Sequence, residues 1–313
     1  MTASLRMGTR ASALARTQSG LVAESITRAT GIAVETVIIR TEGDRLSTEG
    51  KAPPGGDVTG VFTRALDDAL REGRIDFAVH SLKDVPTGVD AGLLLAAVPP
   101  REDPRDAFVV ASRHAGVHSL RALPPRATVA TSSPRRIAQL LRLRPDLKIV
   151  EMTGNVDTRL KKLENGDADA LILACSGLDR LGLSSVIRLR LAPEELLPAP
   201  AQGALAVVCR SSDSGTIEAL ATQDDRVSRA TAEAERSLLN HLRGGCRAPV
   251  GASAVAGGLD GLELVGRVLS LDGREAIEVV SHGAVSDAVD LGRRVAEDLL
   301  SRGAARLIQD ARA

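Results

Sequence analysis

Apolar and polar positions follow two different periods along the first two thirds of the chain. Short apolar runs between turn residues, such as Phe77–Val79, are typical of strands that are buried on both faces. Other stretches carry apolar side chains on one helical face, as Phe62, Leu66 and Leu70 do. Because strand and helix patterns alternate, the chain is predicted to form two βα-type domains with mostly parallel sheets.

The predicted elements fall into two similar units. The first is expected to contain strand 5–9, helix 12–30, strand 34–40, helix 62–73, strand 75–81 and strand 93–98. The second is expected to contain strands 107–111, 128–131, 148–152 and 170–174, with helices 134–144, 156–165 and near 177–183. Strand 204–210 follows a proline-rich crossing segment and is predicted to return to the first unit.

From about residue 225 the pattern changes. A helix is expected over 225–243, and two or three strands follow, with a hairpin turn at Leu271–Arg274. A last helix is expected over about 286–310. The chain is therefore divided into an α/β domain of residues 1–102 plus 202–220, an α/β domain of residues 103–201, and a small α+β C-terminal domain of residues 221–313.

One long segment, Thr41–Thr59, carries no regular pattern. It is polar and rich in glycine and proline, as in Lys51–Asp57. Loops of this length inside a domain are usually functional or disordered. We therefore expect a mobile lid in the first domain.

The composition excludes several classes of function. The 313 residues carry 40 basic and 40 acidic side chains, so no overall field attracts nucleic acid. Aromatic residues are 1%, with no Trp or Tyr, so stacking platforms for bases are nearly absent. No apolar run approaches the roughly 18 residues of a membrane span, and Met1–Arg6 has no signal-peptide core. We expect a cytoplasmic protein that binds neither nucleic acid nor membranes.

The strand at 75–81 runs directly into a Lys83-Asp84 pair and is stopped by Pro86. Ligands of open α/β sheets bind beyond the carboxyl ends of the strands. Asp84 is therefore predicted to lie in a crevice beside a cation and not on a solvated face. The alternative is an ordinary surface ion pair, which contributes little.

Three predicted strand-to-helix junctions carry arginine in the first helical turn: Gly8–Ser12, Thr131–Arg136 and Thr153–Arg159. A cation at a helix N-terminus opposes the helix dipole, at a cost of about 0.3–1 kcal/mol. Three such cases at strand ends indicate a shared anion, although solvated arginines are the alternative. No glycine-rich phosphate loop followed by Lys-Ser/Thr is present, so several carboxylates are the favoured ligand.

The chain has three cysteines, too few and too scattered for a disulfide framework or a zinc site. Cys175 and Cys209 lie in or next to apolar runs and are expected in the core. Cys246 follows Gly244-Gly245 and lies between Arg243 and Arg247. Adjacent cations lower the pKa of a thiol, so a reactive role for Cys246 is one interpretation and an inert loop cysteine is the other.

Together these features resemble the porphobilinogen deaminase (hydroxymethylbilane synthase) family. The resemblance spans the whole chain in order, through Gly8–Arg10, Thr41–Asp44, Val61–Thr63, His80–Thr87, Arg101–Asp106, Ser133–Arg136, Gly154–Arg159, Gln202–Ala204, Glu233–Arg236 and Gly244–Cys246. Each motif by itself is weak, and the full ordered set is specific.

The resemblance implies a fold, a cofactor and a reaction. The fold is two type II periplasmic-binding-protein-like domains plus the C-terminal domain. The cofactor is a dipyrromethane, held through a thioether, onto which four porphobilinogen units are added head to tail with loss of ammonia. Hydrolysis then releases hydroxymethylbilane. The resemblance also implies a monomer with no metal.

The resemblance implies roles for individual residues. Cys246 carries the cofactor covalently, and Asp84 with Lys83 is catalytic, since a buried carboxylate near the pyrrole N–H stabilises an azafulvenium-like cation. The other expected cofactor contacts are Ser12, Ser81, Lys83, Asp84, Thr131, Ser132, Arg135, Arg136, Thr153 and Gly154. The expected substrate contacts are Arg10, Phe62, Arg159, Arg180 and Gln202.

One position departs from the family pattern. The family usually has arginine immediately before the Gly-Asn turn, and here that residue is Thr153. The loss could weaken cofactor assembly or elongation, or it could be offset by Arg113, Arg180 or Arg247. Two rivals to an active enzyme therefore stay open, namely a degenerate paralogue and a solute-binding module that holds pyrrole carboxylates without turnover.

Overall fold

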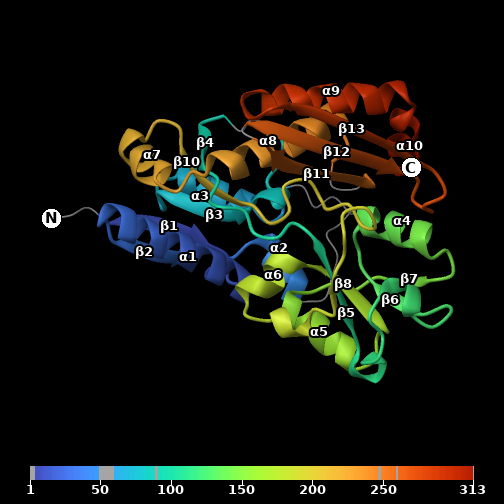
Figure 1. Ribbon diagram of the computed structural model, residues 1–313. Helices are drawn as coiled ribbons and strands as arrows, with labels where there is room; N and C mark the ends of the chain where they lie inside the picture. Colours follow the sequence, from blue (N-terminus) through green and yellow to red (C-terminus); the bar gives the residue numbers. More distant parts are fainter. Residues whose placement is uncertain (1–3, 49–59, 89–90, 246–247, 259, 313) are drawn as a thin grey trace. The chain divides into compact units, whose positions relative to one another are not determined.

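In the computed structural model the described residues are 4–48, 60–88, 91–245, 248–258 and 260–312. The chain forms two compact units (Figure 1), the first made of Met1–Glu102 with Gly203–Arg229 and the second of Asp103–Gln202 with Ala230–Ala313. Strand 204–210 thus returns to the first unit, as predicted. Each unit is described by itself below.

The first unit holds a five-stranded sheet in the order β2-β1-β3-β10-β4. Its strands are β1 (Leu5–Thr9), β2 (Val34–Ile38), β3 (Phe77–Ser81), β4 (Leu93–Ala97) and β10 (Leu205–Arg210). β1 is parallel to β2 and to β3, whereas β10 is antiparallel to β3 and to β4. Because β10 is antiparallel to both of its neighbours, β4 runs in the same direction as β1, β2 and β3, and the prediction of a mostly parallel sheet is confirmed.

The helices of the first unit are α1 (Ala13–Thr30), α2 (Glu42–Thr48), α3 (Arg64–Arg71) and α7 (Ser214–Ala221). α1 begins where Ser12 accepts a hydrogen bond from the Ala15 N–H, and ends at Gly31, which has φ 73°. Its buried side chains, Val22 and Ile26, pack on the sheet with Met7, Phe77 and Val207. α7 has no counterpart among the predicted helices.

The prediction that Thr41–Thr59 is a loop without regular structure is partly wrong. Its first part forms the helix α2, and Thr41 and Gly43 are buried. The Asp44 N–H donates to the Thr41 carbonyl, and the Asp44 carboxylate accepts from the Thr41 hydroxyl at 2.9 Å. These local bonds stabilise a turn that composition by itself did not indicate. The remaining part of the predicted lid, residues 49–59, lies outside the described residues.

The second unit contains another five-stranded sheet, in the order β7-β6-β8-β5-β9. Its strands are β5 (Asp106–Val110), β6 (Thr128–Ala130), β7 (Lys148–Val150), β8 (Ala170–Ala174) and β9 (Leu189–Arg190). β6 is parallel to β7 and to β8, and β5 is antiparallel to β8 and to β9, so the two sheets share one pattern of strand directions. The helices α4 (Pro134–Leu143), α5 (Val156–Glu164) and α6 (Cys175–Arg180) accompany this sheet.

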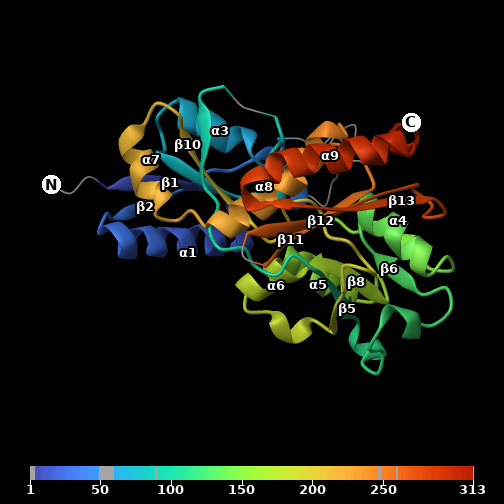
Figure 2. The same ribbon diagram turned by 45° about the horizontal axis from the view of Figure 1, so that its top comes forward.

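The C-terminal part of the second unit is an antiparallel three-stranded sheet with helices on one face (Figure 2). Its elements are α8 (Arg226–His241), β11 (Val250–Gly257), β12 (Gly261–Leu269), β13 (Ala276–Ala284), α9 (Ala288–Ser301) and α10 (Ala304–Asp310). The predicted hairpin at Leu271–Arg274 is confirmed. The predicted single helix over 286–310 is wrong, because Gly303 at φ 98° separates α9 from α10.

Two glycines allow close packing in this part of the molecule. A Cβ at Gly292 of α9 would lie 2.2 Å from the Ala234 carbonyl oxygen of α8, so the two helices approach backbone to backbone. A Cβ at Gly273 would lie 2.3 Å from the Ala138 carbonyl oxygen of α4. The second contact seats the β12–β13 hairpin against α4.

Short 3₁₀ turns complete the architecture. They are η2 (Leu82–Asp84), η3 (Ser112–His114), η4 (Leu120–Ala122), η5 (Ser184–Val186) and η6 (Val285–Asp287). η2 directly follows β3, which is buried from Phe77 to His80, and carries both predicted catalytic residues, Lys83 and Asp84.

Candidate functional site

The Lys83-Asp84 pair lies at the carboxyl end of β3, as predicted. Leu82 is fully buried, and its N–H donates to the Ala204 carbonyl at 3.0 Å, which anchors the start of η2. The Val85 N–H closes the turn on the Leu82 carbonyl at 3.2 Å. Lys83 is half-buried by this turn, whereas Asp84 is exposed. The prediction of a buried carboxylate is therefore wrong.

Asp84 nevertheless lines a cavity of about 80 Å³ within the first unit. Several predicted site residues share this cavity, although they come from three separate segments of the chain. The lining residues are Arg10, Ser12, Leu14, Ala15, Gln18, Phe62, Thr63, Val79, His80, Ser81 and Asp84. The structure thus brings together five of the residues selected from sequence, namely Arg10, Ser12, Phe62, Ser81 and Asp84.

Arg10 has a protein partner that the sequence did not reveal. Its guanidinium donates from Nη2 and Nε to Asp44 Oδ1 at 2.7 and 3.1 Å. The same guanidinium lies 4.2 Å from the centroid of the Phe62 ring, a cation–π contact. The Phe62 ring packs on Gly43, where an added Cβ would lie 2.1 Å from a ring atom. α2 therefore holds both Arg10 and Phe62 in place.

The two predicted serines of this cavity form hydrogen bonds with other residues of the first unit. Ser12 Oγ accepts from the Ala15 N–H at 3.3 Å as the N-cap of α1. Ser81 Oγ lies 3.3 Å from Nε2 of Gln18, a buried residue of α1 that sequence reasoning missed. These bonds fix the hydroxyl positions on the cavity wall.

Two buried polar atoms of the cavity residues have no protein partner among the described residues. They are Thr63 Oγ1 and His80 Nε2, in side chains that are 2% and 6% exposed. Burial, together with the positive charge of Arg10, lowers the pKa of His80 to about 4, so the imidazole is neutral near pH 7. Sequence reasoning did not select these two residues. The signals that could have indicated them are the position of His80 inside an apolar strand and that of Thr63 directly before a helix.

The second unit gathers the predicted arginines at the start of α4. Arg135 and Arg136 are buried, and both pair with the fully buried Asp106 of β5. Arg135 Nη1 donates to Asp106 Oδ2 at 2.7 Å and to the Leu197 carbonyl at 2.7 Å. Arg136 donates from Nε and Nη2 to Asp106 Oδ1 and from Nη1 to the Ile172 carbonyl. Asp106, a partner that sequence reasoning missed, therefore takes up part of their charge.

Asp106 is ionised by its arginine partners. Burial acts to raise the pKa of this carboxyl, but the charges and hydrogen bonds of Arg135 and Arg136 outweigh it and hold the pKa well below the usual range. Gln202, predicted to bind substrate, is fully buried and donates from Nε2 to Asp106 Oδ1 at 3.0 Å and to the Pro104 carbonyl at 2.7 Å. These bonds give the Gln202 amide a structural role.

The arginine cluster keeps excess positive charge. Arg159 donates from Nε to the Gly154 carbonyl at 2.7 Å. Burial and the neighbouring charge of Arg136 lower the pKa of Arg159 to about 10, which still leaves it protonated near pH 7. Arg135 Nε is buried and has no hydrogen-bond partner in the described part of the chain. Arg135 and Arg136 therefore share the single carboxylate of Asp106, Arg159 adds a further positive charge near Arg136, and the cluster is suited to an anion.

The turn before α5 carries the unusual Thr153. Gly154 has φ 119°, and a Cβ there would lie 2.9 Å from Thr158 Cγ2, so the position requires glycine. Lys162 donates from Nζ to the Thr153 carbonyl at 3.2 Å. The sequence suggested Arg113, Arg180 or Arg247 as compensating cations, and the structure adds Lys162 at this turn.

The remaining predicted residues lie as follows. Thr131 Oγ1 accepts from the Ser133 N–H at 3.3 Å, and Ser132 Oγ donates to the Met152 carbonyl at 3.4 Å. Arg180 is half-buried at the end of α6. Cys246 lies outside the described residues.

The other two cysteines are poor nucleophiles. Cys175 and Cys209 are fully buried, and neither forms a disulfide. Burial raises the pKa of Cys175 to about 12 and that of Cys209 to about 11. Both are therefore thiols near pH 7, which confirms their predicted place in the core.

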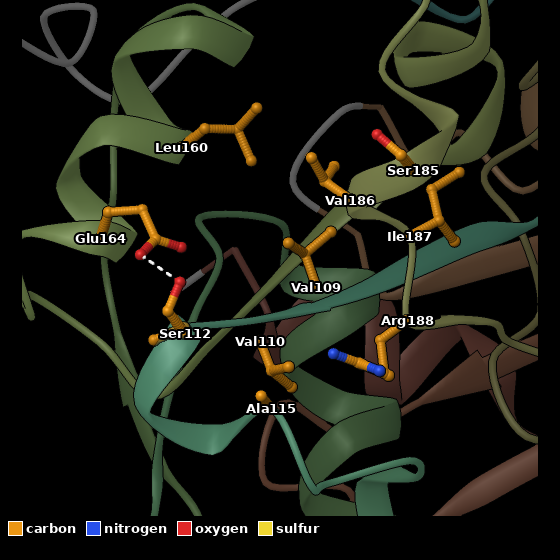
Figure 3. A pocket seen from close by; sticks show the side chains of 11 residues that line it. Val109, Val110, Ser112, Ala115, Leu160, Glu164, Ser185, Val186, Ile187 and Arg188 are labelled. Atoms are coloured by element: carbon orange, nitrogen blue, oxygen red, sulfur yellow. Dashed lines mark hydrogen bonds between the residues drawn. The ribbon is translucent and has the colours of Figure 1, made fainter.

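A larger cavity of about 370 Å³ lies elsewhere in the second unit (Figure 3). It adjoins Val110, the end of β5 opposite to Asp106, and there Ser112 Oγ donates to Glu164 Oε2 at 2.7 Å. Leu160, Val186 and Ile187 supply apolar walls. None of the residues predicted from sequence to bind cofactor or substrate lines it.

Two kinds of site are not found in the described part of the chain. No group of three or more His, Cys, Asp or Glu side chains there could hold a metal ion. None of its helices combines the length and apolar character that a membrane crossing requires.

Comparisons with known proteins match nearly the whole chain. The family model "Porphobilinogen deaminase, dipyromethane cofactor binding domain" matches residues 5–218, and "Porphobilinogen deaminase, C-terminal domain" matches residues 229–301. A porphobilinogen deaminase of Nocardia farcinica is 47% identical over 97% of this chain and 88% of its own. One from Thermobifida fusca is 44% identical over 98% of this chain and 97% of its own.

Solved structures give more distant matches. The VFT2 domain of BvgS from Bordetella pertussis is 17% identical, with a TM-score of 0.43 over 70% of this chain and 86% of that one. The methionine-binding protein MetQ is 14% identical, with a TM-score of 0.42 over 70% of this chain and 89% of that one. Within this chain the strand orders give two five-stranded α/β sheets, and the family model of the C-terminal domain covers a separate stretch, residues 229–301.

Proposed function

The chain belongs to the porphobilinogen deaminase family. From this premise we propose that the cavity at Asp84 and the arginine cluster at the start of α4 have different roles in the reaction. The enzyme joins four porphobilinogen units head to tail, with loss of ammonia at each addition, and releases hydroxymethylbilane. In our proposal the cavity at Asp84 handles the reacting pyrrole. The cluster of Arg135, Arg136 and Arg159 holds carboxylates of the dipyrromethane cofactor and of the growing chain.

The residues of the arginine cluster fit the cofactor. Each pyrrole ring of a dipyrromethane carries an acetate and a propionate, so the group is a polyanion. Two guanidiniums of the cluster pair with the Asp106 carboxylate, Arg159 adds a third positive charge near Arg136, and Arg135 Nε has no partner in the described chain. A carboxylate accepting from these donors would form charge-assisted hydrogen bonds, which are the stronger class. Once bound, the cofactor supplies the nucleophilic pyrrole carbon to which the first substrate is joined.

We place the covalent attachment of the cofactor at Cys246. The burial and raised pKa of Cys175 and Cys209 leave neither of them available as a thiolate. Cys246 follows two glycines and is flanked in sequence by Arg243 and Arg247, which favour the thiolate form. This assignment also agrees with the family resemblance.

Asp84 is proposed to stabilise the charge that develops on the substrate. When the C–N bond of the aminomethyl group breaks, the electron pair leaves with nitrogen as ammonia. The methylene carbon then becomes an electrophile conjugated to the pyrrole ring, and the positive charge spreads to the ring nitrogen. A carboxylate beside that N–H stabilises the cation, and it is most effective when a bound ligand excludes water from the exposed Asp84. Lys83 is proposed to assist as a neighbouring cation.

The finer statements about the protein are part of the same proposal. We propose a cytoplasmic monomer divided into three domains, 1–102 plus 202–220, 103–201 and 221–313, as the family resemblance implies. The C-terminal family model, which begins at residue 229, supports the start of the third domain. Light scattering on the purified protein measures the mass in solution, and a dimer would contradict the monomer.

The observation that carries this proposal is the excess of guanidinium over carboxylate at the start of α4. Intact-mass measurement of the purified protein should show a dipyrromethane adduct, and a turnover assay should show hydroxymethylbilane formation. An adduct without turnover would mean that the arginine cluster holds its ligand while the cavity at Asp84 is inactive. Absence of both would contradict the proposed roles of the two clusters.

A further inference from the structure

Thr63 and His80 line one small cavity, and each carries a buried polar atom that has no protein partner in the described part of the chain. Thr63 Oγ1 and His80 Nε2 are buried in side chains only 2% and 6% exposed. Both residues line the cavity of about 80 Å³ that Asp84 also lines. A buried polar atom without a hydrogen bond is unfavourable, so a ligand that supplied the missing bonds would be stabilised there.

The charges around the cavity favour a cation over an anion. Arg10 is the positively charged residue that lines the cavity. Its Nη2 lies 2.7 Å from Asp44 Oδ1, and this ion pair largely compensates the charge of the guanidinium. Asp84 then remains as the negative charge on the cavity wall. A second carboxylate placed here would be repelled by Asp84, whereas an ammonium group would be attracted.

The available hydrogen-bond groups match an ammonium group. Such a group has three N–H donors. Asp84 and Thr63 offer oxygen acceptors, and the neutral His80 offers Nε2 as an acceptor when its proton is on Nδ1. The low pKa of His80 keeps this acceptor available near pH 7.

We propose that this cavity receives the aminomethyl nitrogen of porphobilinogen, with Thr63 Oγ1 and His80 Nε2 accepting its hydrogen bonds. The inference rests on the proposed role of Asp84, because it requires the reacting pyrrole to lie at that carboxylate. The ammonium group enters attached to the methylene carbon. The C–N bond then breaks, and nitrogen leaves as neutral ammonia with the electron pair. The positive charge stays on the pyrrole-methylene fragment beside Asp84.

This arrangement gives Thr63 and His80 a specific role. They bind the leaving group and contact neither the acetate nor the propionate of the substrate. Their loss should therefore weaken recognition of the amine and leave recognition of the carboxylates unchanged. A site for a substrate carboxylate would behave in the opposite way.

The test compares two ligands on the holoenzyme. One is porphobilinogen, and the other is its analogue with a methyl group in place of the aminomethyl group, which keeps both carboxylates. Thr63→Val removes the hydroxyl and keeps the branched shape, and Thr63→Ser restores the hydroxyl. We expect Thr63→Val to lower kcat/KM for porphobilinogen roughly ten-fold to a hundred-fold, as for loss of one hydrogen bond to a charged group. The inhibition constant of the methyl analogue should change by less than about two-fold.

A second pair of variants guards against a folding defect. His80→Gln keeps a polar group near the position of Nε2, whereas His80→Leu does not. His80→Leu should show the same amine-specific loss, and His80→Gln should recover much of it. If either Thr63→Val or His80→Leu weakens both ligands equally, or weakens neither, the inference is overturned.

The outcome is separable from that of the proposed function. Asp84→Asn tests whether Asp84 is the reacting centre. High turnover by Asp84→Asn would contradict that role whatever the Thr63 variants do. If Asp84→Asn is inactive but Thr63→Val affects both ligands alike, only the assignment of the amine site fails.

Discussion

Arg136 donates from Nε and Nη2 to the same oxygen of Asp106, Oδ1, over 3.1 and 2.6 Å. Arg135, its neighbour in the first turn of α4, donates to the other oxygen at 2.7 Å. One buried carboxylate thus holds two guanidiniums at a helix N-terminus, where a cation is otherwise unfavourable. The relationship explains how the arginines are kept in place without neutralising the whole cluster.

Asp106→Asn should therefore destabilise the protein. Removing one partner leaves two buried guanidiniums without their counter-ion, which typically costs about 3–5 kcal/mol. Denaturant unfolding measures the loss. Asp146→Asn, at the exposed carboxylate of the Arg144 pair, is the matched control and should change stability much less. Equal losses in the two variants would contradict the assigned role of Asp106.

Asp84→Asn should lose most turnover and keep its fold. Loss of one well-placed electrostatic group in an active site costs about 10²–10³-fold in rate. The exposure of Asp84 predicts little change in the unfolding temperature. Product formation is the readout, and a near-wild-type rate would show that another group stabilises the cation.

Cys246→Ala should abolish the cofactor adduct in the intact mass. Cys175→Ala and Cys209→Ala should retain it, because both thiols are buried and protonated. These two variants also control for nonspecific loss of the cofactor. An adduct that persisted in Cys246→Ala would place the attachment elsewhere.

Thr153→Arg should raise cofactor occupancy or turnover. A charge-assisted carboxylate contact is worth about 1.5–3 kcal/mol, and the wild type lacks the family arginine at this position. Lys162 already donates to the Thr153 carbonyl and Arg159 to the Gly154 carbonyl, so a further cation would join two others at this turn. Adduct occupancy and product rate should be measured for both forms. No gain, or a loss, would mean that a nearby cation such as Lys162 already compensates for Thr153.

Stability should depend on pH through His80. Its pKa in the folded protein is about 4, lowered by burial and by Arg10 from an ordinary value of 6.5. Between these values the unfolded chain binds the proton and the folded chain does not, so unfolding becomes easier as pH falls. The expected loss between pH 7 and pH 5 is about 2 kcal/mol.

His80→Gln supplies the comparison for this pH effect, since glutamine does not titrate in the range. Denaturant unfolding of both proteins at pH 7 and pH 5 measures the difference. The variant should lose less stability than the wild type on acidification. Parallel pH profiles would show that the pKa of His80 does not differ between the folded and the unfolded protein, which would contradict its burial in the neutral form.

The sequence by itself determined the fold class and the family. Buried strands, capped helices and turn signals are local features, and most predicted elements lie within a few residues of the observed ones. The reactive segments could also be found, because the carboxyl ends of strands meet at one edge of a sheet. For this reason the sequence points to Asp84, Arg10 and Ser81, and the three residues line one cavity in the structure.

The tertiary structure decided which charges meet. Asp44 lies 34 positions from Arg10, and Asp106 lies 30 positions from Arg136, so no local pattern linked either pair. It also decided burial, because the 3₁₀ turn η2 leaves Asp84 exposed while the strand before it encloses His80. Residue types and spacing specify the local conformation of the chain. Which polar atoms remain without a partner depends on packing between segments distant in sequence, as at Thr63 and His80.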